Sequence, residues 1–312
     1  MNILFFGAGV IGSILAGKLS STGENVTVLD REPRLSEIRA NGILLENGVT
    51  GEKTSARVNT VELLAPNDYY DLVVVPVRAD QLPDILPVLA ANLRIPNILI
   101  MVNNPKGPGQ IVRSLGMERV LLGFPGMGGG QLGSVILYDI AKSLVQPSTF
   151  GELDGRLTPR LKEIVAMFKK AGFPVAIEKN MDAWQKTHVS WVSPLADAIY
   201  MAGGDNYHLA ERPDVIRLMI QGIREAFAVL NDMGVPITPS NFKVVEWCPM
   251  PLQIKVWQKV LAGRDMEMLA TLHCQKAPQE MQQLANDLLA LARGTSISTP
   301  SLDRLSGYVA MQ

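Results

Sequence analysis

The sequence predicts an α/β protein whose first part is a doubly wound parallel sheet and whose second part is all helical. Three observations predict it. A glycine-rich turn at residues 7–12 separates a short apolar run from an amphipathic segment. Apolar runs and amphipathic segments then alternate over the first 180 residues, as in parallel sheets covered by helices. After Asn180 only helical periodicity remains. We therefore expect two domains, 1–180 and 181–312.

The length and composition of the chain exclude several classes of function. The 312 residues exceed what one hydrophobic core usually supports, which agrees with two domains. The 29 basic and 30 acidic residues nearly cancel, and no long basic run occurs, which argues against a nucleic-acid partner. Cys248 and Cys274 lie far apart, so we expect no disulfide scaffold, no metal site and a reduced, cytoplasmic compartment. No apolar run is long enough to span a membrane, and the apolar N-terminus lacks the basic region of a signal peptide.

The expected elements follow from the periodicity. We expect strands at residues 2–6, 25–29, 43–45, 56–58, 71–77, 97–102, 120–124, 133–139, 142–146 and 174–177. A Gly-rich stretch at 126–130 separates two of them. We expect helices at residues 13–21, 34–40, 81–92 and 157–171, and in the second domain at 181–202, 215–233, 251–261 and 279–292.

The first turn has the context of a dinucleotide-binding motif, with a strand before it, a helix after it and a second strand following. Gly7 permits the tight turn, Gly9 lets the pyrophosphate approach the backbone, and Gly12 lets the helix pack close to the strand. The positive end of the helix then faces the phosphates. The alternative is an ordinary turn between a strand and a helix, whose glycines have no role in binding. We expect a Rossmann-type domain in which the whole turn binds the cofactor: Gly7, Ala8, Gly9, Val10, Ile11 and Gly12.

The second strand ends in two residues with opposite implications. Asp30 is the type of residue that binds the ribose hydroxyls of NAD, whereas Arg31 is the type that accommodates the 2′-phosphate of NADP. Spacing alone leaves both cofactors open.

The first helix of the second domain carries a polar stripe. Lys186 and Ser190 are four residues apart, and Ser193 and Asp197 continue the row. A buried lysine there would be a candidate proton donor, although by base rate a surface lysine is the commoner case. Glu280 comes two residues after Pro278, near the start of an expected helix. The simpler interpretation is an acidic residue that the helix dipole favours at this position. His273 and Cys274 are isolated residues for which packing or surface roles are the prior expectation.

With these positions in view, the chain resembles the ketopantoate reductase (2-dehydropantoate 2-reductase) family over most of its length. The order and spacing of the matching pieces carry the resemblance. They are residues 3–9 with Gly12, 26–31, 38–43, 71–75 with 77–79, 98–103, the string 151–155 (Gly-Glu-Leu-Asp-Gly), 184–186, 193–195, and Ile297 with Pro300.

The resemblance implies a role for each matching residue. Arg31 would bind the 2′-phosphate, which favours NADP over NAD, and Arg78 would lie near the cofactor. Asn103 would contact the reacting region and help to place Lys186. Lys186 would be the general acid, and Glu280 would bind the hydroxyl end of the substrate. Ser190 and Ser193 stand at or beside the places where the family usually has asparagines that bind the substrate.

Three departures concern the substrate. Serine is shorter than asparagine and cannot make the same paired hydrogen bonds. The family's Ser-rich stretch is replaced by the largely apolar residues 266–269, and its Asn-Gly pair by Asn103-Asn104, which Pro105 follows. A site that loses such partners discriminates differently.

The resemblance implies an NADP-dependent oxidoreductase that reduces a small 2-oxo acid, acts in pantothenate biosynthesis and could form a homodimer. Two alternatives stay open at this point. One is a hydroxy-acid or opine-type dehydrogenase, and the other is a non-catalytic NADPH-binding sensor.

Overall fold

The computed structural model describes residues 1–142 and 146–308, and they form two compact units. The first unit comprises residues 1–102 and 108–181. The second comprises residues 103–107 and the chain from residue 182 onward. The expected boundary near residue 180 assigned 103–107 to the first domain, whereas these five residues pack with the second unit.

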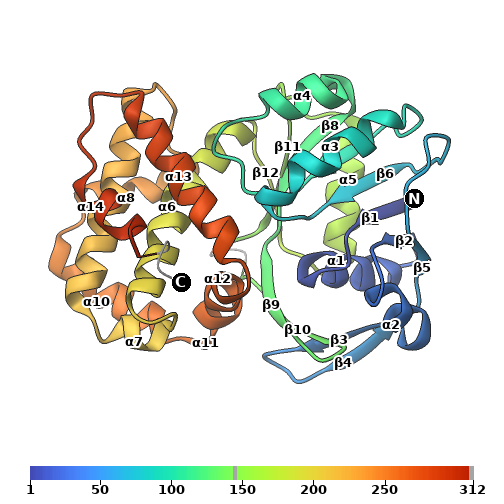
Figure 1. Ribbon diagram of the computed structural model, residues 1–312, viewed down its shortest axis with the longest axis horizontal. Coiled ribbons are helices and arrows are strands. Elements are labelled where there is room, and N and C mark those ends of the chain that lie inside the picture. The colour runs from blue at the N-terminus through green and yellow to red at the C-terminus, as the bar shows by residue number, and fades with distance from the viewer. Residues whose placement is uncertain (143–145, 309–312) are drawn as a thin grey trace. The chain divides into compact units, whose positions relative to one another are not determined.

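An eight-stranded sheet forms the first unit, in the order β12-β11-β8-β7-β6-β1-β2-β5 (Figure 1). Its neighbouring strands are parallel except for β8 and β11, which are antiparallel. The strands are β1 (Asn2–Phe6), β2 (Asn25–Leu29), β5 (Asn59–Val61), β6 (Leu72–Val75), β7 (Ile98–Ile100), β8 (Val120–Phe124), β11 (Ser148–Glu152) and β12 (Val175–Ile177). The predicted doubly wound parallel sheet is confirmed.

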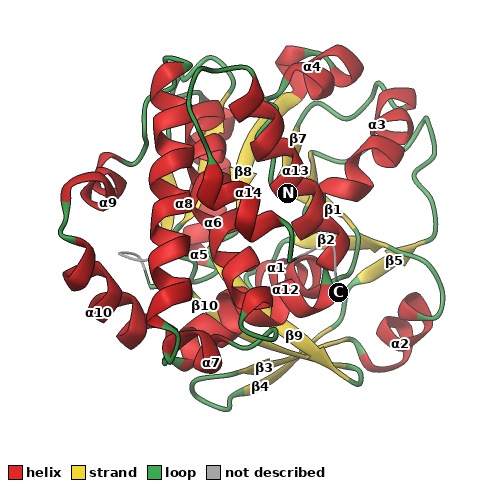
Figure 2. Ribbon diagram, turned by 60° about the vertical axis from the view of Figure 1, so that its left-hand side comes forward, coloured by secondary structure: helices red, strands yellow, loops and turns green. Residues whose placement is uncertain are grey.

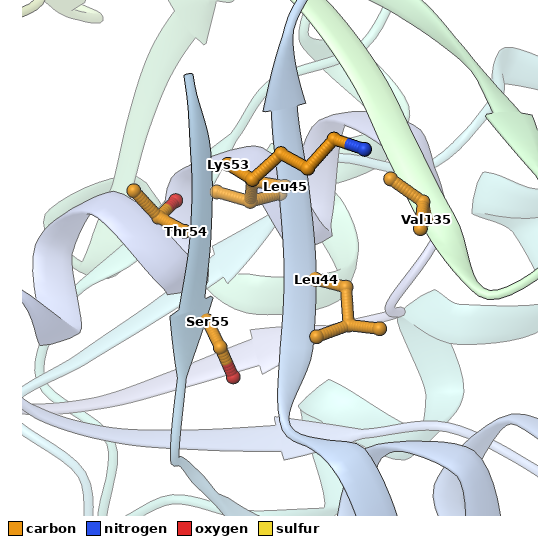
Figure 3. A pocket seen from close by; sticks show the side chains of 6 residues that line it. All are labelled: Leu44, Leu45, Lys53, Thr54, Ser55 and Val135. Atoms are coloured by element: carbon orange, nitrogen blue, oxygen red, sulfur yellow. The ribbon is translucent and has the colours of Figure 1, made fainter. Parts of the chain in front are cut away.

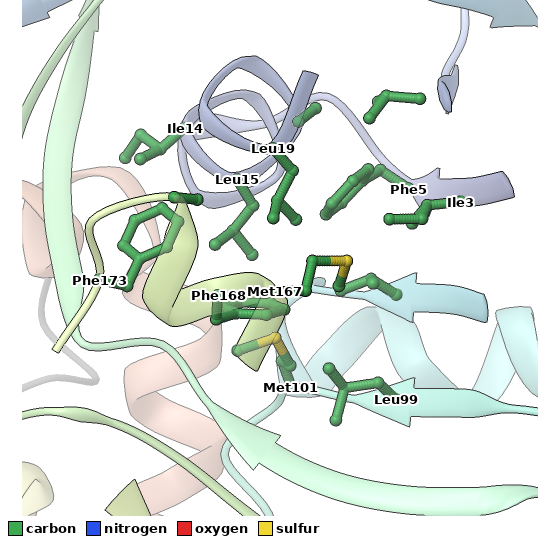
Figure 4. Close-up of a cluster of buried hydrophobic side chains, with 14 of the residues drawn as sticks. Ile3, Phe5, Ile14, Leu15, Leu19, Leu99, Met101, Met167, Phe168 and Phe173 are labelled. Carbon is green, nitrogen blue, oxygen red and sulfur yellow. The ribbon is translucent and has the colours of Figure 1, made fainter. Parts of the chain in front are cut away.

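Apolar residues on both faces of the strands explain the sheet. All four residues of β6 are buried, because helices cover both sides of a parallel sheet. On one side, α1 (Val10–Ser20) and α5 (Pro159–Lys170) form a core in which Leu15, Leu19 and Phe168 lie near Phe5 (Figure 4). Phe150 of β11 meets Phe168 edge to face at 4.7 Å. The remaining helical segments are α2 (Arg34–Asn41), η1 (Ala79–Gln81), α3 (Leu82–Ala91), α4 (Gly109–Leu115) and η2 (Met117–Arg119).

A second, four-stranded sheet has the order β4-β3-β10-β9. Its strands are β3 (Ile43–Asn47), β4 (Lys53–Ala56), β9 (Met127–Leu132) and β10 (Val135–Ile140). The expected separator at 126–130 is largely wrong, because Gly128, Gly129 and Gly130 lie within β9 and only Gly126 precedes it. A Cβ atom at Gly129 would overlap the backbone carbonyl of Leu137, so the close pairing of β9 with β10 requires glycine there.

Other expected strands shift or fall elsewhere. The strand expected at 56–58 is replaced by β4, which pairs antiparallel with β3, and by β5, which joins the edge of the large sheet. The sequence reading missed β11. The strand expected at 142–146 falls on residues 143–145, which lie outside the described part of the chain.

Helices make up the second unit, and Figure 2 shows them in red. They are α6 (Met181–Met201), α7 (Asn206–Ala210), α8 (Pro213–Asp232), η3 (Ser240–Lys243), α9 (Val244–Trp247), α10 (Met250–Leu261), α11 (Arg264–Met266), a π-helical turn η4 (Glu267–Thr271), α12 (Leu272–Lys276), α13 (Pro278–Arg293) and α14 (Pro300–Ser306). Among residues 182–308 no strand occurs, so the predicted all-α second part is confirmed.

Buried polar contacts fix the second unit internally. Asn206 donates to the Leu261 carbonyl at 2.7 Å, and its own carbonyl accepts from the Thr271 hydroxyl at 2.9 Å. The Glu225 carboxylate of α8 accepts from the backbone N–H groups of Ser301 and Leu302 at the start of α14. Over the described residues, no helix is both long enough and apolar enough to cross a membrane.

Candidate functional site

The glycine turn between β1 and α1 combines one open glycine with two constrained ones. Gly7 has a φ of 109°, and its N–H donates to the Leu29 carbonyl at 2.8 Å. A Cβ atom at Gly12 would overlap the Gly7 carbonyl, so only glycine allows α1 to start this close to β1. A Cβ atom at Gly9 would meet no atom within 4 Å. Open space therefore lies beside Gly9, where the unpaired N–H groups of the first helical turn begin.

The end of β2 is tied to this turn by Asp30. One carboxylate oxygen of Asp30 accepts from the Ala8 N–H at 2.6 Å, and the other accepts from the Arg31 N–H at 2.8 Å. Both oxygens thus hold the backbone, while the Arg31 side chain is exposed.

Arg34 is a cation at this turn that the sequence reading missed. Its guanidinium donates to the Ala8 carbonyl at 3.3 Å and to the Ser13 hydroxyl at 3.1 Å, and it pairs with Glu37 at 2.8 Å. The signal was present in the spacing, because Arg34 opens the helix that follows Asp30 and Arg31.

Arg78 follows β6 at the start of η1. Its guanidinium donates two hydrogen bonds to the Asp80 carboxylate, at 3.0 and 2.9 Å. The hydrogen bonds from Arg78 lower the pKa of the Asp80 carboxyl below its usual range. The pair holds Arg78 at the carboxyl end of a parallel strand, the edge at which open α/β sheets bind ligands.

The turn has the features that a dinucleotide requires. It offers space beside Gly9, donors at a helix N-terminus, and the cations of Arg31 and Arg34. These residues fit the pyrophosphate and the adenosine end of such a cofactor.

Lys186 lies in the second unit and is only 8% exposed, so the surface alternative is wrong. Its ammonium group donates to the Asp182 carboxylate one helical turn earlier. Gly107 packs against this pair. A Cβ atom at Gly107 would lie 2.8 Å from Asp182 Oδ1 and 3.3 Å from Lys186 Nζ, and its φ of 81° also favours glycine.

Glu280 is the third residue of α13 and is 2% exposed. Its Oε1 accepts from Asn103 Nδ2 at 3.2 Å, and its Oε2 lies 2.9 Å from His273 Nε2. The structure therefore brings three residues together: Asn103, Glu280 and His273. Glu280 is also the acidic residue of the first turn of α13, where the helix dipole favours it, so the structure is compatible with the alternative as well.

The segment 103–107 joins the two polar clusters of the second unit. Asn103 bonds to Glu280 of α13, Lys106 pairs with Asp287 of α13 at 2.7 Å, and Gly107 lies against the Lys186–Asp182 pair of α6. Segment 103–107 thus contacts Glu280 at one end and Lys186 at the other.

Ser190 and Ser193 lie beyond Lys186 on α6 and are fully buried. Within the described part of the chain, neither hydroxyl has a hydrogen-bond partner, and the side-chain oxygen of Asn103 also has none. Buried polar groups are normally paired, so these atoms are available to a bound molecule. His188, by contrast, stacks on Trp184 with ring centroids 5.1 Å apart, which gives it a packing role.

His273 and Asp182 were not identified from the sequence. Asp182 had a usable signal, because it precedes Lys186 by four residues on a helix. His273 had none, since a helix break at Ala277 separates it from Glu280 and no spacing rule covers such a break.

A shallow surface pocket on the small sheet is lined by none of the predicted site residues. Leu44, Leu45, Lys53, Thr54, Ser55 and Val135 line it (Figure 3). It contributes nothing to the site described above.

Residues 3–148 match the family model for ketopantoate reductase PanE/ApbA. The 2-dehydropantoate 2-reductase of Pyrococcus horikoshii is 24% identical over 263 residues, which cover 78% of this chain and 79% of that protein.

Solved structures share the fold over the whole chain. A 2-dehydropantoate 2-reductase from Geobacter metallireducens GS-15 superposes with a TM-score of 0.83 at 17% identity, covering 100% of this chain and 99% of that one. A D-mandelate dehydrogenase solved with NADH and anilino(oxo)acetate has a TM-score of 0.79 at 15% identity, with coverages of 100% and 97%.

The fold is that of a Rossmann-type domain followed by a helical domain, and the glycine turn has the form that binds a dinucleotide. The matches confirm the predicted resemblance to the ketopantoate reductase family, which is a family of NAD(P)-dependent reductases.

Proposed function

We propose that this protein uses NADPH to reduce the keto group of a small 2-oxo acid, with Lys186 as the general acid. The observation that carries the proposal is the buried Lys186, which pairs with the partly exposed Asp182 and is linked through residues 103–107 to the buried carboxylate of Glu280. A buried ammonium group beside unpaired hydroxyls is suited to bind and protonate an oxyanion.

The residues of the second unit account for the acid-base part of the reaction. A reduced nicotinamide, when bound, supplies the hydride to the keto carbon. The Lys186 ammonium binds the keto oxygen, stabilises the negative charge that develops there and donates its proton to form the hydroxyl group. Asp182 holds the ammonium on the helix face. Ser190 and Ser193 offer hydroxyls to the substrate, while Asn103 and His273 hold Glu280 in place.

The proposed preference for NADPH rests on the contacts of the charged residues that follow β2. Both oxygens of Asp30 already accept hydrogen bonds from backbone N–H groups. Asp30 therefore has a structural role in the turn in addition to any contact with the ribose of a cofactor. Arg31 is exposed and Arg34 lies beside the turn, so two cations are available to a 2′-phosphate. The glycine turn, with Arg78 as a further cofactor contact, completes the proposed set: Gly7, Ala8, Gly9, Val10, Ile11 and Gly12.

A second candidate is a hydroxy-acid dehydrogenase with a substrate other than 2-dehydropantoate. The favouring observation is that both oxygens of Glu280 already have protein partners, whereas Ser190 and Ser193 have none. A substrate that depends on the two serines rather than on two asparagines fits this arrangement. Action in the cytoplasm and a homodimeric state are part of the proposal in either case, whereas a role in pantothenate biosynthesis belongs only to the candidate that reduces 2-dehydropantoate.

The decisive experiment compares Lys186→Ala with the wild type. We expect kcat for 2-oxo acid reduction to fall by about 100- to 10,000-fold, because one positioned general acid contributes about that much. Binding of NADPH, followed by its fluorescence, should be unchanged. Near-normal turnover in this variant would overturn the assignment. NADPH binding by the wild type without reduction of any 2-oxo acid would point to the sensor alternative.

A further inference from the structure

One face of α6 continues beyond the residues that the proposed chemistry uses. Lys186, Ser190, Ser193 and Asp197 are spaced by three or four residues and therefore share a face. Asp197 is 2% exposed. Tyr200 extends the same row, and its hydroxyl donates to the Cys274 carbonyl of α12 at 2.5 Å. The row therefore faces α12, which leads into Glu280.

Three polar atoms in this row have no hydrogen-bond partner among residues 1–142 and 146–308. They are Ser190 Oγ, Ser193 Oγ and Asp197 Oδ1, and all three are fully buried. A few unpaired buried atoms scattered through a protein are ordinary, but three in succession on one helix face are a concentration that needs a cause. A bound molecule that supplies the missing partners is such a cause.

The charge state of Asp197 limits the chemistry of that molecule. Burial raises the pKa of the Asp197 carboxyl well above its usual value, which favours a neutral acid. Burial raises the pKa of the Tyr200 hydroxyl and of the Cys274 thiol, and the nearby carboxyl groups of Asp197 and Glu280 add to the rise, so both acids lie close to these two groups. A neutral carboxyl group and two hydroxyls can each donate and accept, and none of them requires a cation.

The length of the row limits the size of the molecule. At about 1.5 Å of rise per residue, Ser190 and Asp197 lie roughly 10 Å apart along the helix. A short chain with several hydroxyl groups matches this series of neutral partners better than an alkyl chain does.

We propose that Ser190, Ser193 and Asp197 form a subsite for the hydroxylated side chain of the substrate, which is a polyhydroxylated 2-oxo acid of about five or six carbons. The keto end lies at Lys186 and the hydroxyl groups extend along α6 toward Asp197. This inference rests on the proposed reductase function, and it names the substrate class of that site.

The test compares two 2-oxo acids of equal chain length. One is 2-oxo-3-deoxygluconate, which carries three hydroxyl groups, and the other is 2-oxohexanoate, which carries none. We expect the wild type to prefer the hydroxylated acid in kcat/KM by about 100-fold or more. Asp197→Leu should remove most of this preference by raising KM for the hydroxylated acid, and kcat/KM for 2-oxohexanoate should fall much less. Asp197→Asn, which keeps a hydrogen-bonding group, should retain part of the preference.

The outcomes separate the two proposals. Preference for 2-oxohexanoate in the wild type, or an equal loss for both acids in Asp197→Leu, would overturn the subsite while the reductase function stands. Preference for 5-guanidino-2-oxopentanoate over the hydroxylated acid would show that Asp197 binds a cation, which also contradicts the subsite. If neither acid is reduced, the reductase function fails. Calorimetric binding of 2-oxo-3-deoxygluconate to the wild type but not to Asp197→Leu would then still support the subsite, and equal or absent binding would refute it.

Discussion

His273 Nε2 lies 2.9 Å from Glu280 Oε2, so a side chain that is 45% exposed is joined to a carboxylate that is 2% exposed. The second oxygen of Glu280 is held by Asn103. The carboxylate is therefore fixed from two sides, and one of its partners reaches solvent. This arrangement makes His273 a positioning residue for Glu280.

We predict that His273→Ala raises KM for the 2-oxo acid by about tenfold and changes kcat less. A hydrogen bond to a charged group contributes about 1.5–3 kcal/mol, which corresponds to at least a tenfold effect. His273→Gln should restore part of the affinity, since its amide can still donate to Glu280. Steady-state kinetics with saturating NADPH measures the effect, and an unchanged KM in the alanine variant would contradict it.

Asp182 positions the Lys186 ammonium within one turn of α6. We predict that Asp182→Asn lowers kcat by about tenfold with little change in KM, because the ammonium group loses the partner that orients it. Asp182→Glu should recover much of the loss, since the charge remains within reach of Lys186. An equal effect on KM and kcat, or no recovery in the glutamate variant, would indicate a general loss of structure instead.

Arg31 decides between the two nicotinamide cofactors in the proposal. We predict that Arg31→Ala raises KM for NADPH by roughly 10- to 100-fold and leaves KM for NADH nearly unchanged, because only NADPH carries the 2′-phosphate. Arg156→Ala is the matched control, since Arg156 is an exposed arginine paired with Asp154 and lies outside the turn. A similar rise for both cofactors would place Arg31 near the pyrophosphate instead.

The resemblance string at 151–155 shows what the sequence could and could not predict. The sequence identified it only as a family feature, and the structure gives it a packing role. A Cβ atom at Gly151 would overlap the Glu178 carbonyl, and Gly155 has a φ of 73°. Glu152 is buried and pairs with Arg160 at 2.5 Å. The string is thus explained by a close approach, a turn and a buried ion pair.

Local patterns predicted the parts of the site that lie on single elements. Helical spacing alone put Lys186, Ser190, Ser193 and Asp197 in one row. It could not predict the contacts of Glu280, because Asn103 is 177 residues away in the sequence. The strand β9 was missed for a related reason. Its glycines read as a loop, and they are required by the close backbone of β10, a partner that the local sequence does not reveal.

The stability of the protein should depend on pH through Asp197. Burial raises the pKa of this carboxyl in the folded state well above the usual value of 3.8. The folded protein therefore binds a proton that the unfolded chain has released, and stability is fully present below about pH 4 and declines as pH rises toward the folded-state pKa. The decline from one such group is at most about 1.4 kcal/mol per pH unit.

We predict that Asp197→Asn abolishes this component, since the amide does not titrate. The difference in unfolding free energy between the variant and the wild type should grow in favour of the variant from pH 4 to pH 7. Urea unfolding at several pH values measures this difference, and taking the difference removes the groups that both proteins share. A difference that stays constant with pH would mean that Asp197 is ionised in the folded protein. The neutral subsite on α6 would then lose its chemical basis.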